Sequence, residues 1–264
     1  MFSLTLPVST LFEQDPARMA QVERMADAYE IKFVREYKLD PRKERIFHAS
    51  NGIIEHNFIS FIEENRLFDY LARHAIGHLS FDLGPACERC QFILPLSPTL
   101  AKRELLAIAG ERLGYIREHF SGLLAVENLN YYRTGLFESV CEPDFIRDFV
   151  ERFDLYLLLD LAHAAISARN MGRDLYEYLE HLPLRRVIEI HLSRPFIHAF
   201  QSVDAHEKPG KSEFEALGWL LPKLAGNEKV HVAIEYYGEA DGLCRGYRTL
   251  NRLLTANASR GAAA

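Results

Sequence analysis

The chain has 264 residues, of which 48% are hydrophobic and 26% charged, and its formal net charge is −6. This composition suits one folded domain spanning residues 1–264 and disfavours a general nucleic-acid binder, which would carry a basic surface. No apolar run approaches the about 18 residues that a membrane span needs, and the opening MFSLTLPVST lacks the basic and apolar regions of a secretory signal. We therefore expect a cytoplasmic protein with no membrane partner.

Short apolar runs alternate with helical patterns along the chain. The runs that predict strands cover residues 2–8, 29–34, 45–48, 76–81, 123–126, 155–160, 187–191 and 230–235. Helices are expected to begin near Asp15 and at Pro143, and to cover residues 56–73 and 100–119. Further helical patterns lie at 175–182, 214–224 and 246–254, and residues 255–264 are expected to form a loose tail.

Eight strands alternating with helices are typical of a (β/α)₈ TIM barrel, an α/β fold that takes about 250 residues. An open, doubly wound sheet is the alternative. The chain lacks the glycine-rich loops G-x-G-x-x-G and G-x-x-x-x-G-K-[ST] that would support a nucleotide-binding version of such a sheet. Because barrels keep their chemistry at the carboxyl ends of the strands, we expect the functional site at that mouth.

Side chains with metal-binding groups lie in, at the end of, or just past the last six predicted strands. These nine residues are His48, His78, Glu127, Asp160, His163, His191, Asp204, His206 and Glu235. A single histidine is more often a surface residue, or a core residue whose ring nitrogens are hydrogen-bonded, than a metal ligand. Nine His, Asp and Glu residues on successive strands are not expected by chance. Carboxylates in one pocket repel one another unless cations neutralise them, and imidazole with carboxylate suits zinc, iron or manganese. The pattern predicts two or three metal ions with bridging carboxylates.

Three further features point less strongly to a functional role. Cys87 and Cys90 form a CxxC motif after the fourth strand, which could be redox-active or half of a zinc site. Since no second CxxC exists, we interpret this motif as a loop feature without metal. Glu30 and Lys32 share one parity of the second strand, which favours an ion pair inside the barrel. Glu189 shares parity with His191 and could orient it.

The stretch LLLDLAHAAISARNMGRDLYEYLEHLPLRRVIEIHLS, followed by DAHEKP, resembles the multinuclear non-haem iron-dependent oxidative enzymes. This family includes the iron enzyme of methanobactin biosynthesis and belongs to the xylose-isomerase-like TIM barrels. The motifs HLSFDLG and VENLNYY fit the same pattern, as does Glu235. The resemblance implies O₂-dependent modification of cysteine residues in a ribosomally made precursor peptide, a step of natural-product biosynthesis. It also implies a small partner protein that presents the peptide.

The same resemblance implies two or three irons per chain, in mixed Fe²⁺ and Fe³⁺ states, with zinc as a possible substitute. The first iron would be held by His48, His78 and Glu127. The second would be held by the four residues that carry catalysis, with Glu127 as the bridge: Glu127, Asp160, His191 and Glu235. The third site would consist of His163, Asp204 and His206. Many family members have Asn where this chain has His163. This departure bears on whether the third site is occupied and on which metal it prefers.

Two other enzyme classes remain as alternatives. The order of ligands is similar to that of endonuclease IV, a tri-zinc barrel that cuts DNA at abasic sites, and His163 fits that enzyme better. Sugar isomerases of the xylose-isomerase type share the barrel but usually use fewer histidines. The acidic composition and the lack of an obvious arginine and aromatic set for flipping a nucleotide favour the iron enzyme. A non-catalytic metal-binding barrel is the remaining alternative.

Overall fold

A closed barrel of parallel strands forms the centre of the molecule in the computed structural model, which describes residues 1–91, 94–197 and 202–261. Around the barrel the strand order is β1-β12-β9-β8-β7-β4-β3-β2, which confirms the predicted (β/α)₈ TIM barrel. The barrel strands are β1 (Phe2–Pro7), β2 (Ala28–Ile31), β3 (Glu44–Gly52), β4 (His78–Asp82), β7 (Leu123–Glu127), β8 (Tyr156–Asp160), β9 (Val187–Leu192) and β12 (Val230–Ile234). The first and last of them pair in parallel and close the barrel.

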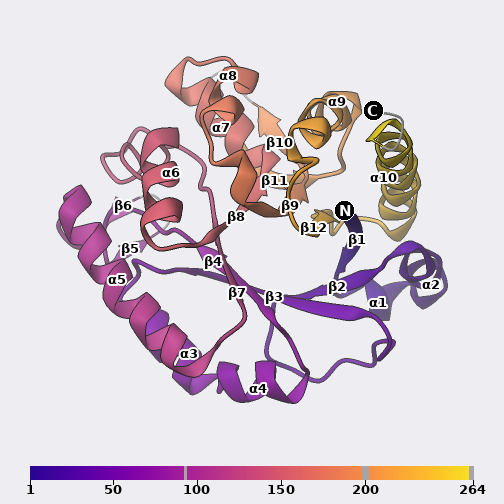
Figure 1. Ribbon diagram of the computed structural model, residues 1–264, viewed down its shortest axis with the longest axis horizontal. Coiled ribbons are helices and arrows are strands. Elements are labelled where there is room, and N and C mark those ends of the chain that lie inside the picture. Colours follow the sequence, from indigo (N-terminus) through magenta and orange to yellow (C-terminus); the bar gives the residue numbers. More distant parts are fainter. Residues whose placement is uncertain (92–93, 198–201, 262–264) are drawn as a thin grey trace.

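Helices surround the barrel, as Figure 1 shows. They are α1 (Leu11–Gln14), α2 (Pro16–Met25), α3 (Phe58–Glu64), α4 (Leu67–Arg73), α5 (Lys102–His119), α6 (Pro143–Arg152), α7 (Leu161–Met171), α8 (Leu175–Glu180), α9 (Lys211–Leu220) and α10 (Ala240–Gly261), with 3₁₀ turns η1 (Leu184–Arg186) and η2 (Leu221–Leu224). Two antiparallel hairpins interrupt the alternation: β5 (Cys90–Gln91) with β6 (Leu94–Pro95), and β10 (Arg194–Ile197) with β11 (Ser202–Glu207). Within the described residues, no helix is long and apolar enough to cross a membrane.

Burial on both faces explains why the strands are nearly continuous apolar runs. Every residue of β9 is buried, as expected for a parallel strand with helices outside and the barrel interior inside. On α6, the apolar stripe of Phe145, Ile146 and Phe149 is buried against this barrel. Inside, Ala125, Leu158 and Ile188 form a small separate apolar cluster. Ala125 and Leu158 lie two residues before Glu127 and Asp160, so this cluster lies below the polar mouth.

The structure differs from the predicted elements in several places, of which three concern predicted bounds. β3 continues to Gly52, beyond the predicted end at residue 48, because a register shift between Ala49 and Gly52 keeps it paired with β4. The single helix expected at 56–73 is divided into α3 and α4, since Arg66 takes a positive φ of 50° between them. The tail expected at 255–264 is helical as far as Gly261, because α10 continues through it, and 262–264 lie outside the described residues.

The carboxyl end of β3 lies against the segment that follows β4. A Cβ atom on Gly52 would lie 2.6 Å from the Cα of Gly84, which itself has a positive φ of 84°. A backbone approach this close tolerates only glycine at position 52. It holds two neighbouring strand ends, and therefore part of the mouth, in a fixed relation.

Replacing Gly52 by alanine should destabilise the fold by about 1–3 kcal/mol, because the added methyl group overpacks against backbone that cannot move aside. Urea denaturation followed by circular dichroism measures this. Gly114→Ala is the matched control: Gly114 lies in α5 with no atom within 4 Å of the added Cβ. The control should be neutral or stabilising by up to about 1 kcal/mol. Equal effects of the two variants would contradict this account of Gly52.

Candidate metal centre

A first group of ligand-type side chains lies at the ends of β3, β4 and β7. His48 Nε2 lies 3.2 Å from Glu127 Oε2 and 3.6 Å from Asp82 Oδ1. On the other side of the ring, His48 Nδ1 lies 3.1 Å from the Ser80 hydroxyl, which fixes the orientation of the imidazole. Asp82 pairs in register with Glu127 on the next strand, so their carboxylates start from the same level of the barrel.

A second group lies at the ends of β8, β9 and β12. Asp160 and His191 are register partners, and Glu235 directly follows β12. His191 Nδ1 lies 3.5 Å from Glu127 Oε1 and 3.4 Å from Glu235 Oε2. Glu127 therefore takes part in both groups, with a different oxygen facing each.

A third group is contributed by α7 and by the hairpin strand β11. His163 Nε2 and His206 Nε2 lie 3.4 Å and 3.2 Å from the same oxygen, Asp204 Oδ2. His206 Nδ1 lies 3.5 Å from Glu235 Oε2, and His163 Nδ1 lies 3.5 Å from Glu127 Oε1. The third group is thus continuous with the other two.

The backbone around α7 explains why His163 reaches the mouth. Asp160 caps the helix, with Oδ1 accepting a hydrogen bond of 2.7 Å from the backbone N–H of His163. Asn128 joins the ends of β7 and β8, because its amide bonds both the N–H and the C=O of Asp160. One Asp160 oxygen is therefore used for capping, and Oδ2 is left for the mouth.

His206 lies on β11 with a positive φ of 43°, a conformation that costs a non-glycine residue about 1–3 kcal/mol. Its ring packs edge-on against Tyr237, with centroids 5.7 Å apart. Strain of this kind is concentrated at functional sites, where surrounding contacts hold it.

The structure brings eight of the nine predicted residues together, and His78 is the exception. His78 is the first residue of β4, at its amino end, whereas Asp82 is the last. Its Nε2 lies 3.1 Å from Glu189 Oε2, and its ring packs against His231 deeper in the barrel. The expectation that His78 lies at the mouth is therefore wrong in this structure, because four residues of strand separate it from the carboxyl end.

Asp82 is the residue that sequence reasoning missed. It shares strand parity with His78 and Ser80 and directly ends the strand, which is the signal that could have identified it. Its Oδ1 is buried without a hydrogen-bond partner and faces His48. In this structure Asp82 occupies the place in the first group that the family resemblance assigned to His78.

The charges of the mouth shift the pKa values of its groups in opposite directions. Burial alone raises the pKa of Glu127, but the charges of His48, His191 and His163 hold it well below its usual range. Burial and the charge of Glu127 raise the pKa of Asp82 well above its usual value, and burial raises that of Asp160. Burial lowers the pKa of His191, but Glu30 and neighbouring carboxylates outweigh it and raise that pKa well above normal. Without metal, the mouth therefore retains protons at neutral pH.

The donor atoms fit metal ions. Four sets of three side chains bring their ligand atoms within 4.8 Å of one another: Glu30, Glu189 and His191; His48, Asp82 and Glu127; Glu127, Asp160 and His163; and Asp160, His191 and Glu235. Several buried donors have no hydrogen-bond partner among the described residues, including Asp82 Oδ1, Asp160 Oδ2 and His191 Nδ1. Such atoms are costly to bury unless a cation or water satisfies them. Imidazole and carboxylate donors suit iron, zinc and manganese.

The CxxC motif lies outside these groups. Cys87 is buried, and burial together with Cys90 raises the pKa of its thiol to about 11. A thiol with so high a pKa is a poor nucleophile at neutral pH. The interpretation of the motif as a loop feature without metal stays a prediction.

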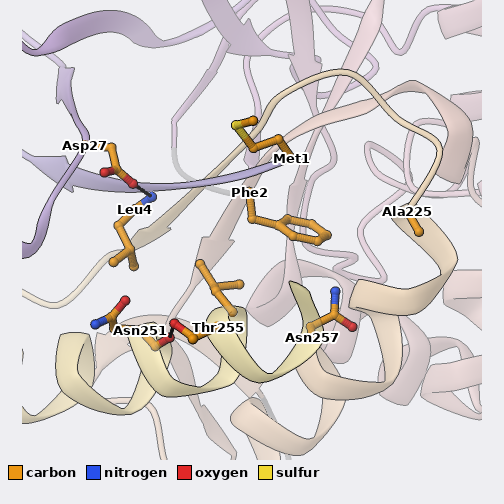
Figure 2. A pocket seen from close by; sticks show the side chains of 9 residues that line it. Met1, Phe2, Leu4, Asp27, Ala225, Asn251, Thr255 and Asn257 are labelled. Carbon is orange, nitrogen blue, oxygen red and sulfur yellow. Dashed lines mark hydrogen bonds between the residues drawn. The ribbon is translucent and has the colours of Figure 1, made fainter. Parts of the chain in front are cut away.

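A pocket of about 440 Å³ opens at the opposite end of the barrel, between the start of β1 and α10 (Figure 2). Met1, Phe2 and Thr255 line it, and the Asp27 carboxylate there accepts a hydrogen bond from the N–H of Leu4. None of the nine predicted ligands lines this pocket, so the chemistry-bearing groups and this cavity are separate features.

A family model described as "RiPP precursor modification enzyme MbnB/TglH/ChrH" matches residues 62–231, well over half of the chain. The chain belongs to this family. Its members modify precursors of ribosomally synthesised and post-translationally modified peptides, and the resemblance found in the sequence is thereby confirmed. The matched range includes seven of the nine predicted ligands, with His48 before it and Glu235 after it.

Curated relatives carry only the designation UPF0276 protein. One from Caulobacter vibrioides (strain NA1000 / CB15N) is 31% identical over 114 residues, which cover 43% of this chain and 41% of that protein. Another, from Paraburkholderia phytofirmans, is 35% identical over 115 residues, 44% of this chain and 36% of that protein. The chain thus matches about two fifths of the length of these relatives.

Solved structures share the fold at low identity. A xylose isomerase domain protein from Planctomyces limnophilus superposes with a TM-score of 0.65 at 12% identity, covering 99% of this chain and 98% of that chain. Endonuclease IV from Thermus thermophilus gives 0.62 at 16% identity, covering 97% and 99%. The 3-keto-D-glucoside 4-epimerase YcjR from E. coli gives 0.59 at 15% identity, covering 97% and 100%. These likenesses concern the barrel and not the reaction.

Asp82→Ala should lower the bound metal by about one ion per chain, because it removes one of three donors of the first group. His78→Ala should leave the metal content close to that of the wild type, since His78 lies below the mouth. Elemental analysis after anaerobic reconstitution measures both variants. A larger loss of metal in His78→Ala than in Asp82→Ala would contradict the placement of these two residues.

Metal binding should release protons, and its affinity should rise from about pH 6 to about pH 8. The raised pKa values of Asp82, His163 and His191 mean that these groups hold protons in the metal-free protein, and a metal must displace them. Calorimetric titration with Co²⁺ in buffers of different ionisation enthalpy gives the number of protons released. Proton uptake, or tighter binding at the lower pH, would contradict this description of the mouth.

Proposed function

We propose that this chain is a multinuclear iron enzyme that uses O₂ to modify cysteine residues of a ribosomally made precursor peptide. Membership of a family of precursor modification enzymes supports a peptide substrate. The clustered imidazole and carboxylate donors support metal use. The proposal also includes a small partner protein that presents the peptide.

The observation that carries the proposal is the position of Glu127. This buried carboxylate directs Oε2 toward His48 and Oε1 toward His163 and His191, so one side chain serves two neighbouring groups of donors. A carboxylate shared in this way is suited to bridge two ions. In this assignment Glu127 is the bridge of a multinuclear centre.

The geometry supports three ligand groups. His48, Asp82 and Glu127 would hold one ion, and a second would be held by Glu127, Asp160, His191 and Glu235. The third would be held by the group from α7 and β11, namely His163, Asp204 and His206. Iron, when bound, supplies one-electron chemistry toward O₂, which zinc, having no redox change, does not.

The protein's own part is to position the peptide and to control protons. Large apolar side chains are exposed on segments that follow barrel strands: Phe33 after β2 is 66% exposed, and Leu94 and Leu96 in and after β6 are 64% and 63% exposed. Apolar side chains at the rim suit contact with a peptide backbone and its neighbouring side chains. The His206 side chain is 38% exposed, against 13% for Asp204 and His163, which suits a position beside the entry of a substrate in this proposal.

The decisive experiment mixes anaerobic, Fe²⁺-loaded protein with a cysteine-containing peptide encoded beside its gene, in the presence of any co-encoded partner, and then adds O₂. We expect O₂ consumption coupled to a change in peptide mass, read by mass spectrometry. Asp160→Ala should reduce the rate at least about 100-fold, since loss of a ligand exceeds the effect of losing its orienting partner. His119→Ala, on the outer side of α5, is the matched control and should retain the wild-type rate.

Two outcomes would end the oxidase proposal. One is full activity of protein that contains only zinc, because zinc cannot change its oxidation state. The other is cleavage of abasic DNA without O₂, which would assign the same ligands to hydrolysis by a metal-activated water.

A further inference from the structure

The second barrel strand carries two charged side chains that point toward the centre from below. Glu30, in β2, is fully buried, and Lys32, one residue past the strand, is largely buried. Lys32 Nζ lies 3.3 Å from Glu30 Oε1, so the ion pair expected from strand parity is present. Each member also contacts a proposed metal ligand, and an ion pair alone does not require that.

Glu30 contacts the side of His191 that faces away from the mouth. Glu30 Oε2 lies 3.1 Å from His191 Nε2 within a hydrogen bond, while His191 Nδ1 faces Glu127 and Glu235 and has no hydrogen-bond partner among the described residues. A carboxylate can only accept here, so the proton of a neutral His191 resides on Nε2 and the lone pair on Nδ1. A carboxylate that accepts a hydrogen bond from a ligand histidine fixes the tautomer of the imidazole and makes its metal-binding nitrogen more basic.

Lys32 contacts one of the two oxygens of Glu235. Its ammonium group pairs with Glu235 Oε1, and the Tyr237 hydroxyl donates to the same oxygen at 3.1 Å. The other oxygen, Oε2, faces His191 Nδ1 and His206 Nδ1. Glu235 therefore offers a single oxygen to the centre, at the point where the second and third groups meet.

We propose that Glu30 and Lys32 are positioning residues of the centre: Glu30 presents Nδ1 of His191, and Lys32 restricts Glu235 to one ligand oxygen. This inference rests on the proposed function, in which His191 and Glu235 bind metal. The two residues act in opposite directions. Glu30 strengthens cation binding through His191, whereas the ammonium group of Lys32 repels cations and occupies an oxygen that could otherwise bind one.

The test is titration of the metal-free, full-length protein with Co²⁺ under nitrogen, followed by visible absorption. Glu30→Gln keeps the shape of the side chain and should weaken Co²⁺ binding about 10- to 100-fold. Lys32→Met should tighten it about tenfold or more, because a repelling charge is lost. The absorption should also weaken in Lys32→Met, as expected for higher coordination when both oxygens of Glu235 bind.

Control variants separate positioning from general damage. Lys32→Arg restores the cation and should restore the wild-type spectrum. Lys43→Met removes a lysine whose ammonium group bonds the backbone carbonyls of Glu23 and Ala26, remote from the mouth. It should change thermal stability without changing Co²⁺ binding. In the background of Glu235→Gln, Lys32→Met should no longer alter the spectrum, because an amide has only one oxygen and cannot bind through two.

A purely structural ion pair predicts that Glu30→Gln and Lys32→Met both weaken Co²⁺ binding, or that neither changes it, and either result overturns the inference. If Lys32→Met does not fold, Lys32→Gln is read by the same criteria. A wild-type protein that binds no Co²⁺ at all would refute the metal centre itself. Wild-type binding with no opposite effects of the two substitutions would refute only the positioning roles.

Discussion

The electrostatic cost of burying carboxylates is the constraint on which the mouth of this barrel depends. Glu127 is 3% exposed, yet three imidazoles surround it within 3.5 Å and hold its pKa well below normal. The pKa of Asp82, its register partner on β4, is raised well above normal by burial and by Glu127 itself. Two neighbouring carboxyl groups whose pKa values are shifted in opposite directions share one proton in the metal-free protein. Divalent ions bound at Glu127 would neutralise the negative charge of these carboxylates.

The barrel meets this constraint through register. Parallel pairing places Asp82 beside Glu127, and Asp160 beside His191, at the same edge of the sheet. The small apolar cluster of Ala125, Leu158 and Ile188 packs inside the barrel below the ends of β7 and β8. Lys32 adds a permanent positive charge, and burial lowers its pKa less than Glu30 and Glu127 raise it, so it stays protonated. The ligand groups are therefore supported from beneath as well as from the sides.

Enzymes with different reactions share this barrel. The similar structures include an epimerase and an endonuclease. Chemistry in such a fold is decided by the groups at the strand ends and by the loops that cover them. In this chain the β11 strand of the β10–β11 pair brings Asp204 and a strained His206 to the mouth, where both contact other ligand-type side chains. In Figure 1 this hairpin lies beside α7, the helix that carries His163. The third group thus depends on α7 and β11, which lie outside the eight barrel strands.

Much of this architecture was determined by the sequence alone. The spacing of apolar residues and the alternation of side chains along a strand can both be read from a short stretch of chain. The eight strands, the closed barrel and five of the mouth residues follow from apolar runs that end in His, Asp or Glu. The other three, His163, Asp204 and His206, were predicted from the segments that follow two of these runs. Parity also showed that Glu30 and Lys32 face inward. Parity states which face a side chain takes but not its height along the barrel axis, and His78 and Asp82 share one parity. Only the pairing of β4 with β3 and β7 decided that Asp82 reaches the mouth while His78 lies near Glu189 and His231. The partners of Lys32 were likewise decided by tertiary structure, since Glu235 lies 203 residues away and is brought beside it only when β1 and β12 close the barrel.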